Sequence, residues 1–544
     1  MDLKLSSWER TTDAPILSMT AGDALRRATS KAPDQLALVE AAPEGMASLV
    51  GAARTDRRWT WAELERDALA CAGWLAARFA PGERICLWAP NVPEWVILQF
   101  GAALAGLVLA TANPALRAGE LRHVLRRSGA VALFHAGSFR GSDMAAIAAE
   151  AAPEDDDAAP RRFLLRELSA MTGCADADHP LPQVSPDAPA QIQFTSGTSG
   201  QPKGALLRHR SLTTNAALVA ARFGQSGDVV LTPMPLFHTA GSVLGVLGAA
   251  TTASTLVLPA MFEPALMLDL AERERAGILY GVPTMLSALL GRQMATPRDL
   301  SSLRLAVSGG APVPAELCRR VEAAFGAPVV SVYGQTELSP IVCATEASDS
   351  AVDRAETAGR PLPQVDLRIA DPDTGAPVAI GEEGEIQARG YQTMIAYVDQ
   401  PEATARTLDK DGWLRTGDLG RMDARGYVRV TGRLSDMIIR GGENIYPVEV
   451  ENTLVTHPAV AQAAVFGVPD DHWGEVVGAA ISIMEGMQPP SVDELRRHCR
   501  AALAPHKTPA LWIFTDAFPM TASGKIQKFA LRDQVTSGAL APAG

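Results

Sequence analysis

The sequence is poor in the features that a disulfide framework or a zinc site needs. None of its six cysteines belongs to a C-x-x-C pair, and their spacing fits no metal site. They are Cys71, Cys86, Cys174, Cys318, Cys343 and Cys499. Scattered cysteines of this kind fit a reducing compartment. The first residues, MDLKLSSWERTTD, also lack the apolar stretch of a signal peptide. We therefore expect a cytoplasmic protein.

Basic residues are outnumbered by acidic ones. The chain has 49 Lys and Arg against 61 Asp and Glu, which gives a net charge of −12. Broad binding to nucleic acid needs a basic face, so this balance argues against nucleic acid as a partner. Small anionic ligands are not excluded, because a local basic site can lie in an acidic protein.

Long apolar runs are almost absent, with one exception. The run WVILQFGAALAGLVLATA, residues 95–112, is about long enough to cross a bilayer. Pro93 and Pro114 bound it, two glycines interrupt it, and no basic residue flanks its start closely. We interpret it as a buried helix followed by a buried strand, and expect no integral membrane segment.

Hydrophobic patterning divides the 544 residues into several units. From Thr60 to Ile380, helical patterns alternate with short apolar runs such as RICLWAP and TLVLPA, which predicts parallel sheets in an α/β fold. After Gly381, short strands separated by Gly turns predict a small antiparallel β-unit. Beyond Leu434, the order strand, helix, strand, strand, helix, strand predicts a small α+β domain. The expected boundaries are 1–434 for the N-terminal domain, 435–536 for the C-terminal domain and 537–544 for a disordered tail.

One polar segment, TSGTSGQPKG at residues 195–204, follows an apolar run and precedes a helical pattern. Its glycines let backbone N–H groups converge on an anion, and Lys203 adds a positive charge. It is not a Walker A loop, because Lys203 is followed by Gly204 instead of Ser or Thr. Taken alone, the segment fits a flexible turn as well as a phosphate cradle.

Four further segments carry candidate chemistry. Asp418 in TGD could accept hydrogen bonds from ribose hydroxyls, although turn aspartates are common. Arg433 offers a fork of donors to phosphate or ribose oxygens, or is a surface arginine. VYGQTELSP, residues 332–340, supplies an aromatic ring for a purine, a hydroxyl and a carboxylate for Mg²⁺. SGKIQK places Lys525 on a glycine-flanked turn.

In this order and over this span, these motifs resemble the adenylate-forming superfamily, which contains acyl-CoA synthetases, peptide-synthetase adenylation domains and beetle luciferase. The resemblance runs from about Met19 to Arg532 and includes PLFHTAG, SGGAPVP and DGWLRTGDLG. GGENIYPVEVE and SGKIQK are most similar to the acyl-CoA synthetase branch. The resemblance implies a large N-terminal domain of two α/β subdomains and a β-barrel, followed by a small mobile α+β domain.

The resemblance also implies an ATP site. Lys525 would bridge the acid and the α-phosphate as the catalytic lysine, Thr336 would contact the α-phosphate, and Glu337 would ligate Mg²⁺. Asp418 and Arg433 would hold the ribose. The other implied ATP contacts are Thr195, Ser196, Gly197, Thr198, Ser199, Gly200, Lys203, Gly309, Gly310, Ala311, Pro312, Tyr333, Gly334 and Gln335.

For the second step, the resemblance implies that Gly441, Gly442 and Glu443 line the route of coenzyme A. His238 in PLFHTAG would act as a gate between ATP and thiol, while a turn histidine satisfied by backbone is the alternative. The hinge position carries Ser435, where the family usually has Asp or Lys, so the balance between the two domain orientations is open. Lys528 lies close to Lys525, but the family pattern favours Lys525.

The implied reaction activates a carboxylic acid with ATP and Mg²⁺ to an acyl-adenylate, then transfers the acyl group to CoA. Pocket segments such as HTAGSVLGVLGAA contain no Lys, Arg, Asp or Glu, which favours an apolar monocarboxylate, a medium or long fatty acid. An aryl acid, or a carrier-protein pantetheine as acceptor, are the alternatives within the family. A nucleotide-binding scaffold without catalysis is the alternative outside it, and a homodimer is left open.

Overall fold

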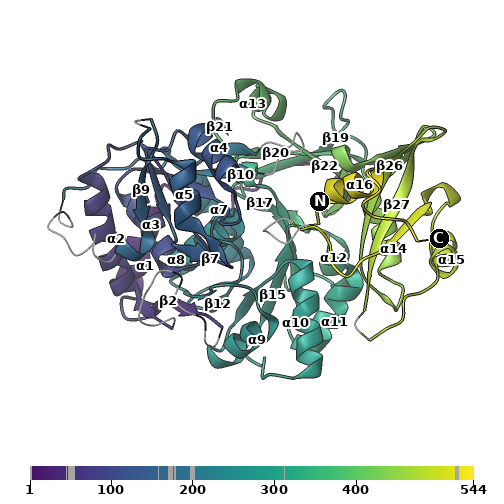
Figure 1. Ribbon diagram of the computed structural model, residues 1–544, viewed down its shortest axis with the longest axis horizontal. Helices are drawn as coiled ribbons and strands as arrows, with labels where there is room; N and C mark the ends of the chain where they lie inside the picture. Colours follow the sequence, from purple (N-terminus) through teal and green to yellow (C-terminus); the bar gives the residue numbers. More distant parts are fainter. Residues whose placement is uncertain are drawn as a thin grey trace.

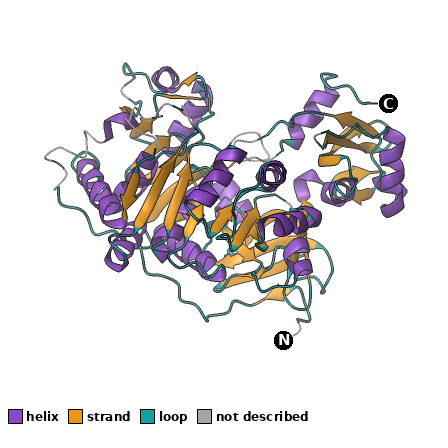
Figure 2. Cartoon of the chain, turned by 90° about the horizontal axis from the view of Figure 1, so that it is seen from below, coloured by secondary structure: helices purple, strands orange, loops and turns teal. Residues whose placement is uncertain are grey.

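The computed structural model describes residues 3–543 apart from a set of short segments (Figure 1). The residues outside the description are 44–45, 47–48, 50–55, 157, 169–175, 177–178, 196–201, 312, 485 and 521–525. The described residues form three large sheets and a two-stranded sheet, β7 (Ser138–Phe139) with β8 (Ser142–Asp143), in the larger, N-terminal part. A further sheet forms the smaller C-terminal part, which stands apart from the rest in Figure 2.

The first large sheet has seven strands, and its five central and outer strands from β10 to β9 run parallel. In spatial order they are β21 (Ala396–Tyr397), β11 (Lys203–Arg208), β10 (Pro189–Thr195), β5 (Val108–Ala112), β4 (Arg84–Trp88), β6 (Ala132–His135) and β9 (Arg161–Leu164). The described helices between residues 21 and 222 are α1 (Ala21–Lys31), α2 (Trp61–Ala76), α3 (Pro93–Leu104), α4 (Ala118–Ser128), α5 (Met144–Ala151) and α7 (His209–Arg222).

The long apolar run forms α3 and β5, so the prediction of a buried helix followed by a buried strand is confirmed. All residues of α3 and of β5 are buried. Pro93 occupies the first turn of the helix, where its missing N–H is not needed. Among the described residues, no helix combines the length and the apolarity that a bilayer crossing requires.

The second large sheet has nine strands, and its six central strands from β16 to β2 are parallel, as the alternating pattern predicted. In spatial order they are β18 (Arg360–Pro361), β17 (Ile341–Ala344), β16 (Val329–Gly334), β15 (Leu305–Gly309), β14 (Ile278–Tyr280), β12 (Val229–Leu231), β13 (Thr255–Pro259), β2 (Leu36–Ala41) and β3 (Arg58–Thr60). Its helices are the π-helix η3 (Ala240–Leu247), α8 (Gly248–Thr252), α9 (Pro264–Arg273), α10 (Pro283–Ala295), α11 (Ala315–Phe325) and α12 (Ala351–Glu356).

The third sheet is antiparallel, and it is formed mainly by the part of the chain for which we expected a β-barrel. Its strands in spatial order are β1 (Ser7–Trp8), β19 (Val365–Ala370), β20 (Gly384–Gly390), β22 (Leu414–Met422) and β23 (Val428–Arg433). A short helix, α13 (Pro401–Thr407), precedes β22. The chain crosses from this sheet into the C-terminal part directly after Arg433, through a single 3-10 turn, Leu434–Asp436.

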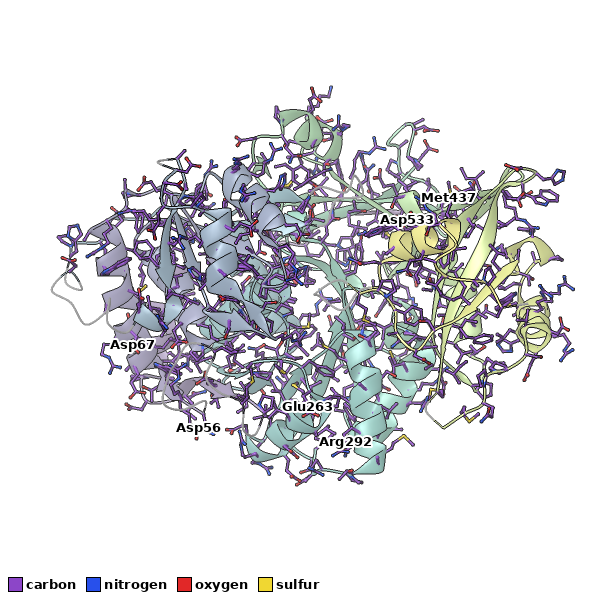
Figure 3. All side chains as sticks on the ribbon, viewed as in Figure 1. Asp56, Asp67, Glu263, Arg292, Met437 and Asp533 are labelled. Carbon is purple, nitrogen blue, oxygen red and sulfur yellow. The ribbon has the colours of Figure 1, made fainter. Side chains whose placement is uncertain are left out.

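The C-terminal part follows the predicted order and adds a strand, β25, and a final helix, α16, that were not predicted from the sequence. Its elements are β24 (Ile438–Arg440), β25 (Glu443–Ile445), α14 (Pro447–Leu454), β26 (Val460–Asp470), β27 (Gly474–Ile483), α15 (Val492–Ala502), β28 (Leu511–Phe514) and α16 (Lys528–Thr536). In Figure 3, the label of Met437 marks the start of this part and that of Asp533 marks α16.

The tail, which we expected to be disordered, makes two contacts in the structure, and its disorder stays a prediction. Leu540 packs against the apolar cluster around Phe466 and Leu531, and the amide of Ala543 donates a hydrogen bond of 2.6 Å to the carbonyl of Trp512. The physical reason is composition: the tail is small and apolar, so it can cover an apolar surface of the neighbouring helix and sheet.

Candidate active site

The adenine wall predicted from sequence lies at the carboxyl ends of β15 and β16, neighbouring parallel strands. Ligand sites of parallel sheets occur at such ends. Two glycines there are required by close packing. A Cβ on Gly309 would collide with Val332, and one on Gly334 would collide with the carbonyl of Pro340. Gly310 has φ of +77°. A side chain at Gly309 or Gly334 would therefore displace the neighbouring backbone or side chains.

Asp418, Tyr333 and Arg433 form a connected group, although 85 residues separate Tyr333 from Asp418. Tyr333 Oη donates to Asp418 Oδ2 at 2.9 Å, and Arg433 Nε donates to Oδ1 at 2.6 Å. Burial, and then the charge of Asp418, raise the pKa of Tyr333. The same carboxylate raises the pKa of Arg433. Each carboxylate oxygen keeps a further lone pair, so this buried group can still accept hydrogen bonds from ribose hydroxyls.

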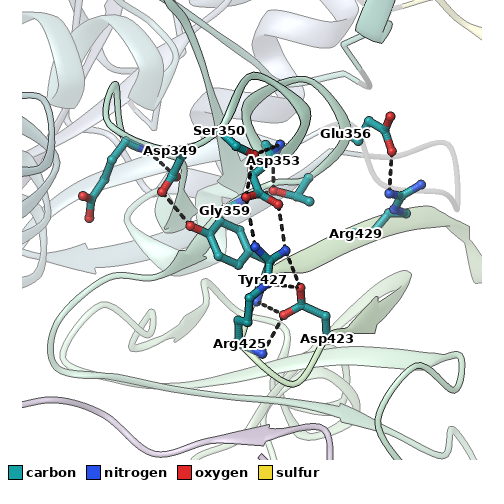
Figure 4. Close-up of polar contacts among 11 residues, drawn as sticks. Asp349, Ser350, Asp353, Glu356, Gly359, Asp423, Arg425, Tyr427 and Arg429 are labelled. Carbon is teal, nitrogen blue, oxygen red and sulfur yellow. Dashed lines mark hydrogen bonds and ion pairs between the residues drawn. The ribbon is translucent and has the colours of Figure 1, made fainter. Parts of the chain in front are cut away.

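The hairpin that carries Asp418 and Arg433 is anchored at its far end by charged contacts with α12 (Figure 4). Arg425 in the turn binds Asp353 with two hydrogen bonds, of 3.1 and 2.8 Å. Tyr427 Oη donates to Asp349 at 2.5 Å. The bonds from Arg425 lower the pKa of the Asp353 carboxyl. Sequence reasoning missed this anchor, because the partners lie more than 70 residues apart and each looks like a surface charge.

Glu337 is 7% exposed and is held by Tyr397 from β21. Tyr397 Oη donates to Glu337 Oε1 at 2.7 Å. The ammonium of Lys203 lies 5.1 Å from the centre of the same ring, within the range of a cation–π contact. Burial, and then the charge of Glu337, raise the pKa of Tyr397, so its hydroxyl stays protonated and donates. Tyr397 was not among the residues predicted from sequence.

The two loops with the most flexible composition lie outside the described residues. These are the phosphate loop, with Ser196, Gly197, Thr198, Ser199 and Gly200, and the turn with Lys525; Pro312 is also outside. The residues that flank the phosphate loop, Thr195 and Lys203, pair across β10 and β11. The assigned roles of these loops stay predictions.

Lys528, the alternative to Lys525, has another partner. Its Nζ lies 2.6 Å from Glu451 Oε1, and that oxygen also accepts a hydrogen bond of 2.7 Å from the amide of Val465. Lys528 thus ties the start of α16 to α14 and β26. The contact gives Lys528 a structural role, and the catalytic role of Lys525 stays a prediction.

His238 lies in the tight turn before the π-helix η3. Its Nδ1 accepts a hydrogen bond of 3.2 Å from the amide of Ala240, and the hydroxyl of Ser242 donates to its carbonyl at 3.2 Å. A Cβ on Gly241 would collide with Pro235, so the turn requires glycine. The Nδ1 contact matches the turn-histidine alternative and leaves a gate role as a prediction.

The predicted CoA residues form an exposed hairpin tip. Gly441 and Gly442 connect β24 to β25 with φ of +58° and +87°. Two positive φ values in a two-residue hairpin define a type I′ turn, which itself favours glycine. A Cβ on Gly441 would meet the exposed ring of Trp473 at 2.8 Å. Ser435 is also exposed and donates to Asp436 at 3.0 Å. Of the predicted ATP-site residues, the structure joins Tyr333, Asp418 and Arg433 in one group, and Lys203 and Glu337 both contact Tyr397. The predicted CoA residues face solvent.

Comparisons with known proteins agree with this arrangement. The profile of the family "AMP-binding enzyme" matches residues 25–398, and that of "AMP-binding enzyme C-terminal domain" matches residues 449–525. YngI of Bacillus subtilis (strain 168), a protein provisionally named as an acyl-CoA synthetase, is 38% identical over 88% of this chain and 92% of its own.

Two further proteins are similar over most of the chain. The human mitochondrial medium-chain acyl-CoA ligase ACSF2 is 33% identical over 95% of this chain and 88% of its own. The crystal structure of the anthranilate CoA ligase AuaEII with anthranoyl-AMP superposes with a TM-score of 0.86 at 26% identity, covering 97% of this chain and 99% of that one. The chain therefore belongs to the adenylate-forming family of AMP-binding enzymes, in its acyl-CoA synthetase branch, and is an ATP-dependent acid–thiol ligase.

Proposed function

We propose that the chain is an AMP-forming acyl-CoA synthetase for medium-chain fatty acids. The observation that carries the ATP half of this proposal is the Asp418 carboxylate, which is held between Arg433 of the antiparallel sheet and Tyr333 near the carboxyl end of β16. The similarity to a ligase named for medium-chain acids supports the chain length. The candidate pocket segments contain no Lys, Arg, Asp or Glu apart from Glu337, which supports an apolar acid.

The first step joins two anions. A carboxylate oxygen of the acid attacks the α-phosphorus of ATP, the bond from that phosphorus to the bridging oxygen breaks, and pyrophosphate leaves with the electron pair. Catalysis then consists mostly of positioning and charge neutralisation. Asp418 fixes the ribose, Thr336 contacts the α-phosphate, and Lys525 reduces the repulsion between the attacking oxygen and that phosphate.

Glu337 fits the metal that such chemistry uses. Tyr397 binds Oε1 of the Glu337 carboxylate, which leaves Oε2 as the oxygen that would ligate the metal. One carboxylate combined with substrate phosphates is the usual environment of Mg²⁺. When bound there, Mg²⁺ would neutralise charge on the phosphates and on the departing pyrophosphate. Among the described residues, no group of three or more His, Cys, Asp or Glu side chains could hold a metal ion.

In the second step, the CoA sulfur attacks the acyl carbon and AMP leaves. Because AMP is a good leaving group, no side-chain nucleophile is needed. The exposed tip at Gly441 and Gly442 has to move to reach the adenylate, and Ser435 lies in the single 3-10 turn that could permit the rotation. In the present arrangement, Tyr446 of the C-terminal part lies beside Glu383 of the N-terminal part. Burial, and then the interaction with Glu383, raise the pKa of Tyr446 to about 12.

The test is a panel of acids with two acceptors. Acetate, octanoate, palmitate and benzoate are each incubated with ATP and Mg²⁺, with either CoA or a pantetheine-loaded carrier protein, and AMP release is measured. We expect the highest kcat/KM for octanoate with CoA. A preference for benzoate would support the aryl-acid alternative. The similarity to the anthranilate CoA ligase is the observation that favours this alternative. A preference for the carrier protein would show that its pantetheine, and not CoA, is the acceptor. The absence of AMP release with every acid would refute the proposal.

A cytoplasmic location also stays a proposal. The scattered cysteines, which fit a reducing compartment, support it, whereas the ACSF2 relative is named as mitochondrial. Fractionation of the native host with antibody detection would decide between the two compartments.

A further inference from the structure

A cavity of about 310 Å³ lies at the amino ends of three neighbouring strands of the first large sheet. Arg84, Val108 and Pro189 are the first residues of β4, β5 and β10, and all three line it. The segment from Pro182 to Ser185 forms its outer wall. The volume is at the lower end of the range for small-molecule sites.

This cavity is separate from the predicted ATP site. Strand β10 starts at the cavity with Pro189 and ends with Thr195, which pairs with Lys203 beside the phosphate loop. A strand of seven residues spans about 20 Å. Ligands of parallel sheets usually bind at the carboxyl ends, so a lined cavity at the amino ends is not explained by the reaction.

The floor of the cavity is shaped by Gly106, which has φ of +71°. A Cβ at this position would lie 3.4 Å from Pro81, Pro182 and Val184. The three side chains thus converge on one point, and the glycine permits the turn into β5. These walls, with Val108 and Leu206, make most of the lining apolar.

The charge in the cavity has one sign. Arg84 is the only charged residue among the lining residues, and Gln183 and Ser185 add neutral polar groups. One N–H of Arg84 donates to the carbonyl of Ser128, the last residue of α4, at 2.9 Å. A guanidinium has five N–H donors, and Arg84 forms no ion pair within the described residues. A half-buried cation without a counter-ion favours an anion beside it.

We propose that this cavity binds an apolar monocarboxylate, with the carboxylate against Arg84 and the hydrocarbon against the proline and aliphatic walls. This is the chemical class of the proposed substrate, so the enzyme would carry a second molecule of acid outside its active site. The lining residues and the charge of the cavity do not depend on the proposed function. Only the choice of octanoate as the probe rests on the proposed function.

The experiment measures binding of radiolabelled octanoate to the full chain by equilibrium dialysis, with and without a sulfamate analogue of octanoyl-adenylate that fills the active site. Two variants test the cavity. Arg84→Gln removes the charge and Val184→Trp fills the apolar part. Arg126→Gln, an exposed arginine on the same end of α4 and outside the lining, is the matched control. Crystals soaked with bromine-labelled octanoate locate the bound molecule.

With the analogue present, we expect one equivalent of octanoate on the wild type and on Arg126→Gln. Arg84→Gln and Val184→Trp should each raise its Kd at least about tenfold, since hydrogen bonds to charged groups and packing of an alkyl chain are both lost. The bromine should lie in the cavity. No binding beside the analogue, or binding that neither variant weakens, would overturn the proposal. If octanoate is not a substrate, the acid panel will show no AMP release with it. The Kd for octanoate can still be compared between the wild type and Arg84→Gln, so the two proposals can fail separately.

Discussion

The Nε of Arg433 lies 2.6 Å from Oδ1 of Asp418, and the two residues face each other directly across the β22–β23 ladder. Arg433 is also the last residue before the 3-10 turn that leads into the C-terminal part. One ion pair therefore joins the predicted ribose contact to the start of the predicted hinge. Loss of the pair would affect nucleotide binding and the placement of the mobile part together.

Asp418→Asn should weaken ATP binding. The amide keeps the shape but removes the negative charge that Tyr333 and Arg433 both contact, and one of its two oxygen acceptors becomes a donor. We expect the KM for ATP to rise about ten- to a hundredfold, with a smaller change in the KM for CoA. Steady-state kinetics with each substrate varied will measure this. Asp373→Asn, an exposed aspartate in the β19–β20 connection, is the control, and an equal effect of the two variants would argue against the assignment.

Tyr397→Phe should weaken the response to Mg²⁺. Without the hydroxyl, Glu337 loses the 2.7 Å bond that fixes its carboxylate. The Mg²⁺ concentration for half-maximal ATP binding, followed by calorimetry, should rise about tenfold, while ATP binding in the presence of a chelator should not change. Tyr391→Phe is the matched control, because its hydroxyl contacts Asn215 instead. Unchanged Mg²⁺ dependence in Tyr397→Phe would remove the positioning role.

Lys525→Ala should separate the two half-reactions. We expect adenylate formation, measured by ATP–pyrophosphate exchange, to fall at least about a hundredfold, because a charge that acts in the transition state is lost. Thioester formation from supplied octanoyl-AMP should be spared. Lys528→Ala removes a nearby lysine that pairs with Glu451 and should spare both steps. Equal losses of both steps in Lys525→Ala would contradict the role.

His209→Gln should make the unfolding free energy less dependent on pH under acidic conditions. His209 is buried, accepts a hydrogen bond of 3.3 Å from the amide of Ala21, and burial lowers its pKa to about 4. Unfolded histidine has a pKa of about 6.5. Between these values the unfolded chain binds the extra proton, so the neutral imidazole stabilises the fold above pH 6.5 and this contribution is lost as pH falls towards 4.

The wild type should therefore lose up to about 3 kcal/mol more unfolding free energy than His209→Gln between pH 6.5 and 4. Denaturant titrations at several pH values will measure the difference. Parallel curves for the two proteins would show that His209 does not titrate on unfolding. The exposed His472→Gln is a control that should follow the wild type.

The sequence predicted the parts of this molecule that local patterns determine. The run Trp95–Ala112, the parallel strands and the order of elements after Leu434 follow from hydrophobic period and turn residues, and the structure confirms them. The residue types of the ATP site came from motifs, and Asp418, Arg433 and Tyr333 do meet.

Contacts between distant segments were not predicted. Tyr397 reaches Glu337 across 60 residues, and Arg425 reaches Asp353 across 72. No local period signals such pairs, because only the packing of separate sheets brings them together. The short strand β25 was missed for a related reason: Glu443–Ile445 becomes a strand by pairing with β24 through the Gly441–Gly442 turn, and its own sequence has little strand propensity.

The most direct test of the central claim follows one oxygen atom. If octanoate attacks the α-phosphorus of ATP and the CoA sulfur then displaces AMP, one carboxylate oxygen must stay on AMP. With octanoate labelled by oxygen-18 in both carboxyl positions, mass spectrometry should find one heavy oxygen in AMP and one in octanoyl-CoA. Unlabelled AMP, with the heavy oxygen in free phosphate or water, would contradict an acyl-adenylate and with it the account of this site.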